Sequence, residues 1–283
     1  MADIQIRTLT EEDFTELHEC WITAFGDYQV KIDMPPSLLK EMFAQNGLVY
    51  EVSVAAYKDN KMIGFLLNGM RTYDGVVTGY DTGTALIPEF RGAGISSKLF
   101  PEAEKTLIKR GMKNYLLEVI QTNEPAYSVY LKNGFKVTRE LIVFQIENLT
   151  SKAFDSRIEI KEERYSKELT NLLEYKPSWQ NSFDAISAMG RGTITYVARE
   201  KNQPVGYITF QRSRRRILQI GAKEIPNKKE IYAALLSQGA NEELGGKDIR
   251  AVNIPTDAKD LIASFEACGF TTMLSQYEMA KGY

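Results

Sequence analysis

A short stretch of the sequence, PEFRGAGISSKL at residues 88–99, joins an arginine to a glycine-spaced turn. It follows an apolar, strand-like segment and precedes a segment with the apolar spacing of a helix. A turn at that position directs several backbone N–H groups into one concavity, at the positive end of the helix dipole. Such a turn is suited to hold an anion, most often a phosphate. The residues of this predicted anion site are Arg91, Gly92, Ala93, Gly94, Ile95 and Ser96.

The elements around this turn alternate between strands and helices. Apolar residues recur every four positions from Ile95 to Leu107, which predicts a helix that ends near Gly111. Three strand-like segments precede the turn, and NYLLEVI follows the helix as another strand. PAYSVYLKNG, with Pro125 in its first turn, predicts a further helix, and FKVTRELIVFQI predicts a final hairpin or one long strand. Residues 1–150 therefore form one complete α/β unit.

The same order of elements repeats in the second half of the chain. TITYVAREKNQPVGYITF parallels EVSVAAYKDNKMIGFLLN, and NIPTDAKDLIASFEACGF parallels TNEPAYSVYLKNGF. The copies differ at chemically informative positions. Residues 227–229, Asn-Lys-Lys, stand in place of the glycine turn, and Phe265 stands opposite Tyr130. We therefore expect a second domain, residues 151–283, that has lost the anion-binding turn and the chemistry.

Two motifs in this order, LIPEFRGAGISSKL and LEVIQTNEPAYSVYLKNGF, are more specific together than either is alone. From Leu86 to Phe135 they resemble the acyl-CoA-binding core of the GCN5-related N-acetyltransferase (GNAT) family, and the surrounding elements extend the resemblance over residues 1–150. The resemblance implies an α/β fold of tandem domains, each with a mixed, largely antiparallel sheet flanked by helices on both faces. It also implies acetyl-CoA as the co-substrate, and tandem members with a degenerate second half are known in this family.

The resemblance assigns roles to particular residues. In this family the arginine-glycine turn, here Arg91 to Ser96, wraps the CoA pyrophosphate. The end of the preceding strand pairs its backbone with the pantetheine, and the matching residues are Leu86 and Ile87. Asn123 matches a residue that commonly contacts the CoA arm. Tyr130 matches the tyrosine that protonates the departing thiolate.

Acyl transfer also requires a neutral amine. Because a lysine-type amine titrates near a pH of about 10.4, a base or a water path must accept a proton. Glu118 matches the base position of some protein N-terminal acetyltransferases that this stretch resembles, and Asp81 is the competing candidate. The alternative for Glu118 is an ion pair with a neighbouring Lys or Arg. A strand N–H near Leu86 would stabilise the charge that develops on the carbonyl oxygen.

The segment WITAFGDYQVKIDMPP lies between the first two predicted helices, where family members usually place loops that contact the substrate. Phe25, Asp27 and Tyr28 are therefore candidates for the acceptor site, and ordinary loop packing is the alternative. The expected acceptor is a small-molecule or peptide amine. An alternative function is that of a catalytically silent sensor or scaffold that binds an acyl-CoA without turning it over.

Composition excludes several other classes. The formal net charge of −2 and the absence of a signal peptide or a long apolar run predict a cytoplasmic protein without nucleic-acid or membrane partners. Cys20 and Cys268 lie far apart, so neither a disulfide framework nor a metal cluster is expected. The single histidine, His18, is expected to be structural. The basic segment at residues 212–216 is interpreted as a solvated hairpin.

Overall fold

Two compact units make up the structure, which is a computed structural model of the chain. The first unit comprises Met1–Thr138 together with Glu278–Tyr283, and the second comprises Arg139–Tyr277. The first segment of unit 1 ends at Thr138, before the predicted boundary at residue 150. Residues 278–283, which include the end of the last strand, also belong to the first unit. The described residues are 4–27, 34–149, 158–239 and 245–283.

Two long strands each contribute to both units. β6 spans Lys136–Asn148, so it begins in the first unit and continues in the second, where it pairs with β11 (Lys247–Pro255). β12 spans Thr271–Gly282 and ends in the first unit, next to β5 (Asn114–Ile120). FKVTRELIVFQI is thus one long strand rather than a hairpin. The last strand of each half of the chain completes the sheet of the other unit.

The sheet of the first unit has the strand order β1-β2-β3-β4-β5, followed by the end of β12. Neighbouring strands from β1 to β4 are antiparallel, whereas β4 and β5 are parallel. Asp59 and Asn60 both have positive φ at the β2–β3 connection, as a tight type I′ hairpin turn requires. The remaining strands of this sheet are β1 (Gln5–Thr8), β2 (Val54–Lys58), β3 (Lys61–Tyr73) and β4 (Val76–Leu86).

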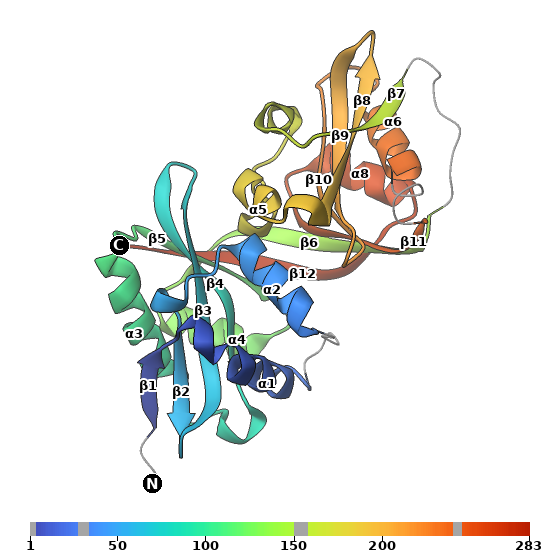
Figure 1. The fold of residues 1–283 in the computed structure, drawn as a ribbon. Coiled ribbons are helices and arrows are strands. Elements are labelled where there is room, and N and C mark those ends of the chain that lie inside the picture. Colours follow the sequence, from blue (N-terminus) through green and yellow to red (C-terminus); the bar gives the residue numbers. More distant parts are fainter. Residues whose placement is uncertain (1–3, 28–33, 150–157, 240–244) are drawn as a thin grey trace. The chain divides into compact units, whose positions relative to one another are not determined.

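Helices cover both faces of this sheet (Figure 1). α1 and α2 bury their apolar residues against one face, in a cluster that includes Trp21 and Phe65. α3 packs on the other face, where a side chain at Gly79 would meet Leu107. This mixed, largely antiparallel sheet between two helical layers confirms the predicted fold class. The helices are α1 (Phe14–Ala24), α2 (Pro36–Asn46), α3 (Ser96–Lys109) and α4 (Glu124–Lys132).

The end of β12 is anchored within the first unit by three contacts. The Tyr283 N–H donates to the Lys113 carbonyl at 3.0 Å, at the start of β5. Lys281 Nζ lies 2.6 Å from Glu104 Oε1 on α3, and both side chains are largely buried. Thr138 Oγ1 donates to the Glu278 carbonyl at 3.1 Å. These contacts connect the edge strand to the helix that begins at the glycine turn.

The second unit repeats the architecture with its own elements. Its strand order is β6-β11-β10-β9-β8-β7, and β10 and β11 are the parallel pair. Its core contains two closely packed aromatic rings, Phe144 and Phe265, with centroids 5.2 Å apart. The further strands and helices are β7 (Glu159–Glu163), α5 (Phe183–Ala188), β8 (Thr193–Glu200), β9 (Gln203–Gln211), β10 (Arg216–Ala222), α6 (Lys228–Ala234) and α8 (Lys259–Ala267).

Candidate active site

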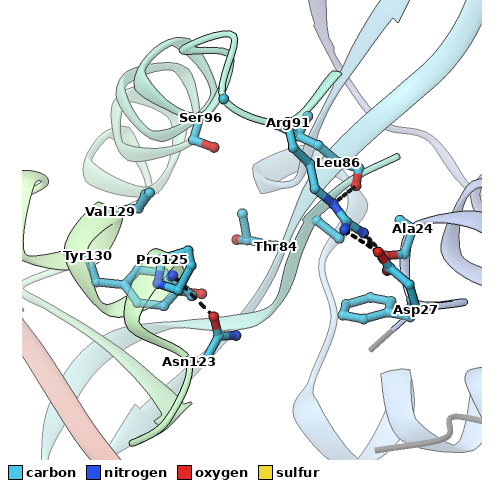
Figure 2. Close-up of a pocket in the computed structure, with 14 residues that line it drawn as sticks. Ala24, Asp27, Thr84, Leu86, Arg91, Ser96, Asn123, Pro125, Val129 and Tyr130 are labelled. Carbon is cyan, nitrogen blue, oxygen red and sulfur yellow. Dashed lines mark hydrogen bonds and ion pairs between the residues drawn. The ribbon is translucent and has the colours of Figure 1, made fainter. Parts of the chain in front are cut away.

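A cavity of about 360 Å³ lies in the first unit, between the end of α1, the end of β4, the glycine turn and α4. Figure 2 shows α4 residues at one side, Arg91 and Asp27 at the other, and Thr84 between them. The cavity therefore brings together several side chains that are distant in sequence. The sequence-predicted site residues that line it are Phe25, Asp27, Leu86, Arg91, Gly92, Ser96, Asn123 and Tyr130.

Other predicted residues lie outside this lining. Asp81 and Glu118 lie on the two diverging strands, and Gly94 belongs to the adjoining turn. Ile87 directs its N–H to the Ile63 carbonyl at 3.0 Å and packs against the α1 cluster. Ala93 and Ile95 belong to the same turn as Gly94, and Tyr28 lies outside the described residues.

The cavity lies where two neighbouring strands diverge. β4 pairs with β5 from Thr78 to Tyr80, yet β4 continues to Leu86 and β5 continues to Ile120. Beyond Tyr80, the described ladder between the two strands ends. Their facing edges therefore carry backbone N–H and C=O groups that are available to a ligand.

A bulge in β4 sets which side chains face the cavity. Asp81 pairs with Asn68 and Gly83 pairs with Leu67, so Thr82 is an extra residue in the ladder. Asp81 and Thr84, three positions apart, would point to opposite faces of a regular strand. With the bulge they share a face, and Thr84 Oγ1 donates to Asp81 Oδ2 at 2.7 Å.

The glycine turn requires left-handed backbone. Gly92 and Gly94 have φ values of 74° and 73°, and a Cβ at either position would meet no atom closer than 3.9 Å. The glycines are thus required by backbone conformation rather than by crowding. Within the described residues, the N–H groups from Gly92 to Ser96 make no backbone hydrogen bond, whereas that of Ser97 donates to Gly94. Successive unpaired N–H groups at the start of a helix form an anion-binding concavity.

Arg91 makes four hydrogen bonds in this structure. Nη1 and Nη2 contact the two carboxylate oxygens of Asp27 at 2.6 and 2.8 Å. Nη2 also donates to the Ala24 carbonyl at 2.8 Å, and Nε donates to the Leu86 carbonyl at 3.1 Å. The guanidinium holds the pKa of the Asp27 carboxyl below its usual value.

Tyr130 forms the opposite wall, from α4. Its side chain is 8% exposed and packs edge-on against Phe100 and Phe135, with ring centroids 5.9 and 6.0 Å away. Asn123 begins this helix, and its side chain accepts a hydrogen bond from the Ala126 N–H at 3.3 Å. The N-cap and the aromatic packing together fix the direction from which Tyr130 enters the cavity.

The two candidate carboxylates lie on opposite faces of the sheet. Glu118 accepts a hydrogen bond from the hydroxyl of Tyr80, the residue next to Asp81 on β4. Consecutive strand residues point to opposite faces, and a side chain at Gly79 would point toward α3. Tyr80 and Glu118 therefore belong to the α1–α2 face, whereas Asp81 belongs to the α3–α4 face with Tyr130.

Asp81 is a buried acid, only 6% exposed. Burial raises its pKa to about 6, although hydrogen bonds from Thr84, the Gly83 backbone and Tyr130 act in the opposite direction. An acid whose pKa is higher in the folded chain than in the unfolded chain contributes stability that is complete below the unfolded value of about 3.9. This stability is lost as the pH rises through about 6.

We therefore expect Asp81→Asn to gain stability over the unchanged chain as the pH rises. When the pH is raised from about 4.5 to about 7.5, the unfolding free energy of the variant should increase by roughly 2 kcal/mol relative to that of the unchanged chain. Urea unfolding at the two pH values measures this difference. Asp59→Asn, the same substitution in an exposed hairpin turn, is the matched control. An Asp81→Asn difference that does not change with pH would contradict the expectation.

The corresponding region of the second unit carries charged side chains that pair with one another. Lys228, at the start of α6, is 5% exposed and forms ion pairs with Glu174, with Glu224 at 2.6 Å and with Asp260 at 3.5 Å. Burial opposes its charge, but the carboxylates outweigh this and raise the pKa of the ammonium. Glu174 also accepts from the Leu261 N–H of α8 at 3.1 Å. The ammonium of Lys228 is thus already paired with carboxylates of its own unit.

Two polar side chains of the site, those of Thr84 and Tyr80, were not identified from the sequence. Thr84 lines the cavity and bonds to Asp81, but a threonine in a strand carries no signal of its own. Tyr80 is the partner of Glu118, where the sequence suggested a Lys or Arg as the alternative. The glycines on both sides of the bulge, Gly79 and Gly83, are the one sequence feature that could have indicated an irregular strand.

His18 and Cys20 lie outside the site and have structural surroundings. His18 Nε2 lies 2.8 Å from the Met34 carbonyl, and Cys20 is buried with its pKa raised to about 12 by desolvation. Among the described residues, no group of three His, Cys, Asp or Glu side chains is arranged to hold a metal ion. In the same part of the chain, no helix has the length and apolar character needed to cross a membrane.

Diverging parallel strands over a cavity, a glycine turn that opens a helix, and a tyrosine on the facing helix are the arrangement that the resemblance to the N-acetyltransferases predicts. Residues 7–135 match the model of the acetyltransferase (GNAT) family, which identifies this part of the chain as a GNAT domain. A curated relative, the spermidine N(1)-acetyltransferase of Thermoplasma acidophilum, is 28% identical over 149 residues, which cover 47% of this chain and 89% of the relative.

Two solved structures share the fold along nearly the whole chain. A GCN5-related N-acetyltransferase from Sphaerobacter thermophilus has a TM-score of 0.74 at 13% identity and covers 99% of this chain and 95% of its own. A tandem GNAT protein from the clavulanic acid biosynthesis pathway has a TM-score of 0.71 at 13% identity, with 99% and 98% covered. The tandem fold predicted from the repeat is therefore confirmed.

Proposed function

We propose that the first unit transfers an acetyl group from acetyl-CoA to a primary amine by direct attack in a ternary complex. The observation that carries this proposal is the cavity, which extends from the unpaired N–H groups of the glycine turn to the end of α1. Donor and acceptor can then approach from opposite faces of the sheet and meet where β4 and β5 diverge. Such positioning supplies much of the catalysis in acyl transfer between two bound substrates.

The donor is assigned to the α3–α4 side. The N–H groups from Gly92 to Ser96 would hold the pyrophosphate, and the unpaired edge of β4 near Leu86 would pair with the pantetheine. Ile87 is less suited to this pairing, because its N–H already donates to Ile63. Asn123 faces the cavity and would contact the CoA arm while it caps α4.

The reaction requires two proton movements. The amine nitrogen attacks the thioester carbonyl carbon, the C–S bond breaks, and the amine loses one proton. Glu118, on the acceptor face with Tyr80, is assigned as the base that accepts it. Tyr130 would donate a proton to the departing sulfur, and Asp81 beside it would orient the hydroxyl. A strand N–H near Leu86 would stabilise the oxyanion by about 3 kcal/mol.

The proposed acceptor is a primary amine. The match to a spermidine N(1)-acetyltransferase makes a polyamine the first acceptor to test. The experiment measures CoA release from acetyl-CoA in the presence of spermidine and a panel of peptide and small-molecule amines. Release with one of them supports the proposal. Tight acetyl-CoA binding without release from any amine would instead favour a silent acyl-CoA sensor.

The second unit is proposed to bind no acetyl-CoA. The ion pairs that Lys228 forms within the unit support this assignment. Phe265, which stands in place of Tyr130, also supports it, because a phenylalanine has no hydroxyl. Calorimetric titration with acetyl-CoA should therefore give one site per chain. Two sites would refute the assignment of the second unit as a degenerate copy.

We expect Tyr130→Phe to lower turnover at least about tenfold while the affinity for acetyl-CoA stays within about twofold. The substitution keeps the ring that packs on Phe100 and removes the hydroxyl that would protonate the sulfur. Tyr127→Phe, on the same helix but outside the cavity lining, is the matched control. An unchanged turnover in Tyr130→Phe would remove it as the acid, and an equal loss in the control would indicate a general effect on α4.

A further inference from the structure

Arg91 contacts two backbone segments on one side of the cavity. Its guanidinium contacts the Asp27 carboxylate and the Ala24 carbonyl of one segment and the Leu86 carbonyl of the other (Figure 2). All three nitrogens of the guanidinium are engaged, at 2.6 to 3.1 Å. A bidentate arginine–carboxylate pair fixes direction as well as distance, because both partners are planar.

This set of contacts joins two parts of the backbone that line the cavity. Ala24 is the last residue of α1, and Phe25 and Asp27 continue from it along the cavity wall. Leu86 is the last residue of β4 and lies on the same wall. Exposed ion pairs stabilise a fold only weakly. The contacts with the Ala24 and Leu86 carbonyls therefore matter more, because they attach the guanidinium to the backbone of both segments.

An alternative use of Arg91 would be as a direct phosphate ligand. To reach a phosphate, the guanidinium would have to leave Asp27 and release the carbonyls of Ala24 and Leu86. The adjacent N–H groups from Gly92 to Ser96 make no backbone hydrogen bond to the described part of the chain and need no rearrangement there to bind an anion. The contacts therefore favour a structural role for the Arg91 guanidinium and a phosphate-binding role for the backbone N–H groups of the turn.

We propose that Arg91 is a positioning residue that ties the end of α1 to the end of β4, rather than a direct ligand of the phosphates. The inference rests on the proposed function, because it assigns the roles within the acetyl-CoA site. Asp27 supports the tie, because its carboxylate holds both Nη atoms of the Arg91 guanidinium.

The test compares Arg91→Gln, Asp27→Asn and the double variant with the unchanged chain. Calorimetry with acetyl-CoA reports affinity, and amide hydrogen exchange without any ligand reports the opening of residues 22–27. Arg7→Gln is the matched control, because Arg7 forms a similar bidentate pair with Asp13, at 2.6 and 3.0 Å, outside the cavity lining.

If Arg91 is a tie, Arg91→Gln weakens acetyl-CoA binding about three- to tenfold, and Asp27→Asn weakens it by a smaller factor, because the contacts of Arg91 with the Ala24 and Leu86 carbonyls remain. The double variant is then no weaker than Arg91→Gln. Exchange at residues 22–27 then becomes faster in all three, but not in Arg7→Gln. If the guanidinium is a phosphate ligand, Arg91→Gln alone weakens binding, while Asp27→Asn leaves it unchanged or tightens it. That result overturns the inference, as do single variants that both keep the original affinity and exchange rates.

Failure of the proposed function is distinguishable from failure of this inference. If the unchanged, folded chain does not bind acetyl-CoA, the proposed function fails. In that case, hydrogen exchange still decides whether Arg91 ties α1 to β4, since it is measured without the donor.

Discussion

Gly94→Asp should abolish detectable binding of acetyl-CoA, with a loss of affinity of roughly a hundredfold or more. The substitution places a carboxylate among the unpaired N–H groups of the turn, where the proposal puts the pyrophosphate. Two like charges about 4 Å apart near a protein surface repel by about 4 kcal/mol, which exceeds the energy needed for a hundredfold effect. Calorimetric titration measures the result directly.

The control for this variant lies at the other end of the same helix. Gly111 follows α3, has a φ of 88° and also has open space around its Cβ position. Gly111→Asp therefore introduces the same side chain into similarly strained backbone, but away from the turn. Acetyl-CoA binding that survives Gly94→Asp, or that is lost equally in Gly111→Asp, would contradict the assignment of the turn.

A fragment that ends at residue 150 should fail to form a stable, acetyl-CoA-binding domain. It contains the glycine turn, Tyr130 and both carboxylates, but lacks residues 278–283, which belong to the first unit. Without them, Glu104 on α3 loses Lys281, and β5 becomes an exposed edge that can pair with other chains. Soluble yield, circular dichroism and acetyl-CoA titration of the fragment test this expectation.

A second fragment separates the missing strand from other causes of failure. Thr138 and Glu278 are hydrogen-bonded neighbours, so a short loop can join residue 138 directly to residues 278–283. This joined fragment should recover folding and acetyl-CoA binding if the strand is what the shorter fragment lacks. A fragment of residues 1–150 that is folded, monomeric and binds acetyl-CoA as the full chain does would contradict the role of this strand.

Several features of the fold could be predicted from the sequence because their signals are local. The four-residue apolar spacing after Ile95 predicted the helix that spans Ser96–Lys109. Glycines were expected to form a turn, and both Gly92 and Gly94 do have positive φ. The repeat predicted a tandem fold because each copy carries the same succession of locally encoded elements.

The second copy illustrates where the sequence signal ends. The sequence shows that Lys228 stands in place of the glycine turn. That its ammonium is buried between Glu174, Glu224 and Asp260 depends on residues up to 54 positions away in the chain. Glu224 lies four positions before Lys228, but no local spacing relates Lys228 to Glu174 or Asp260, so only the folded chain could show that its ammonium is paired with all three carboxylates.

The sequence alone thus determined the family, the order of elements and the position of the turn and Tyr130. The tertiary structure decided how these parts are connected: Arg91 with Asp27, Glu118 with Tyr80, and the end of β12 with the first unit. It also placed Asp81 and Glu118 on opposite faces of the sheet, and a bulge at Thr82 brought Thr84 onto the face of Asp81. The physical reason is that helices and turns follow from neighbouring residues, whereas charge partners, strand register and edge pairing are selected by packing between distant segments.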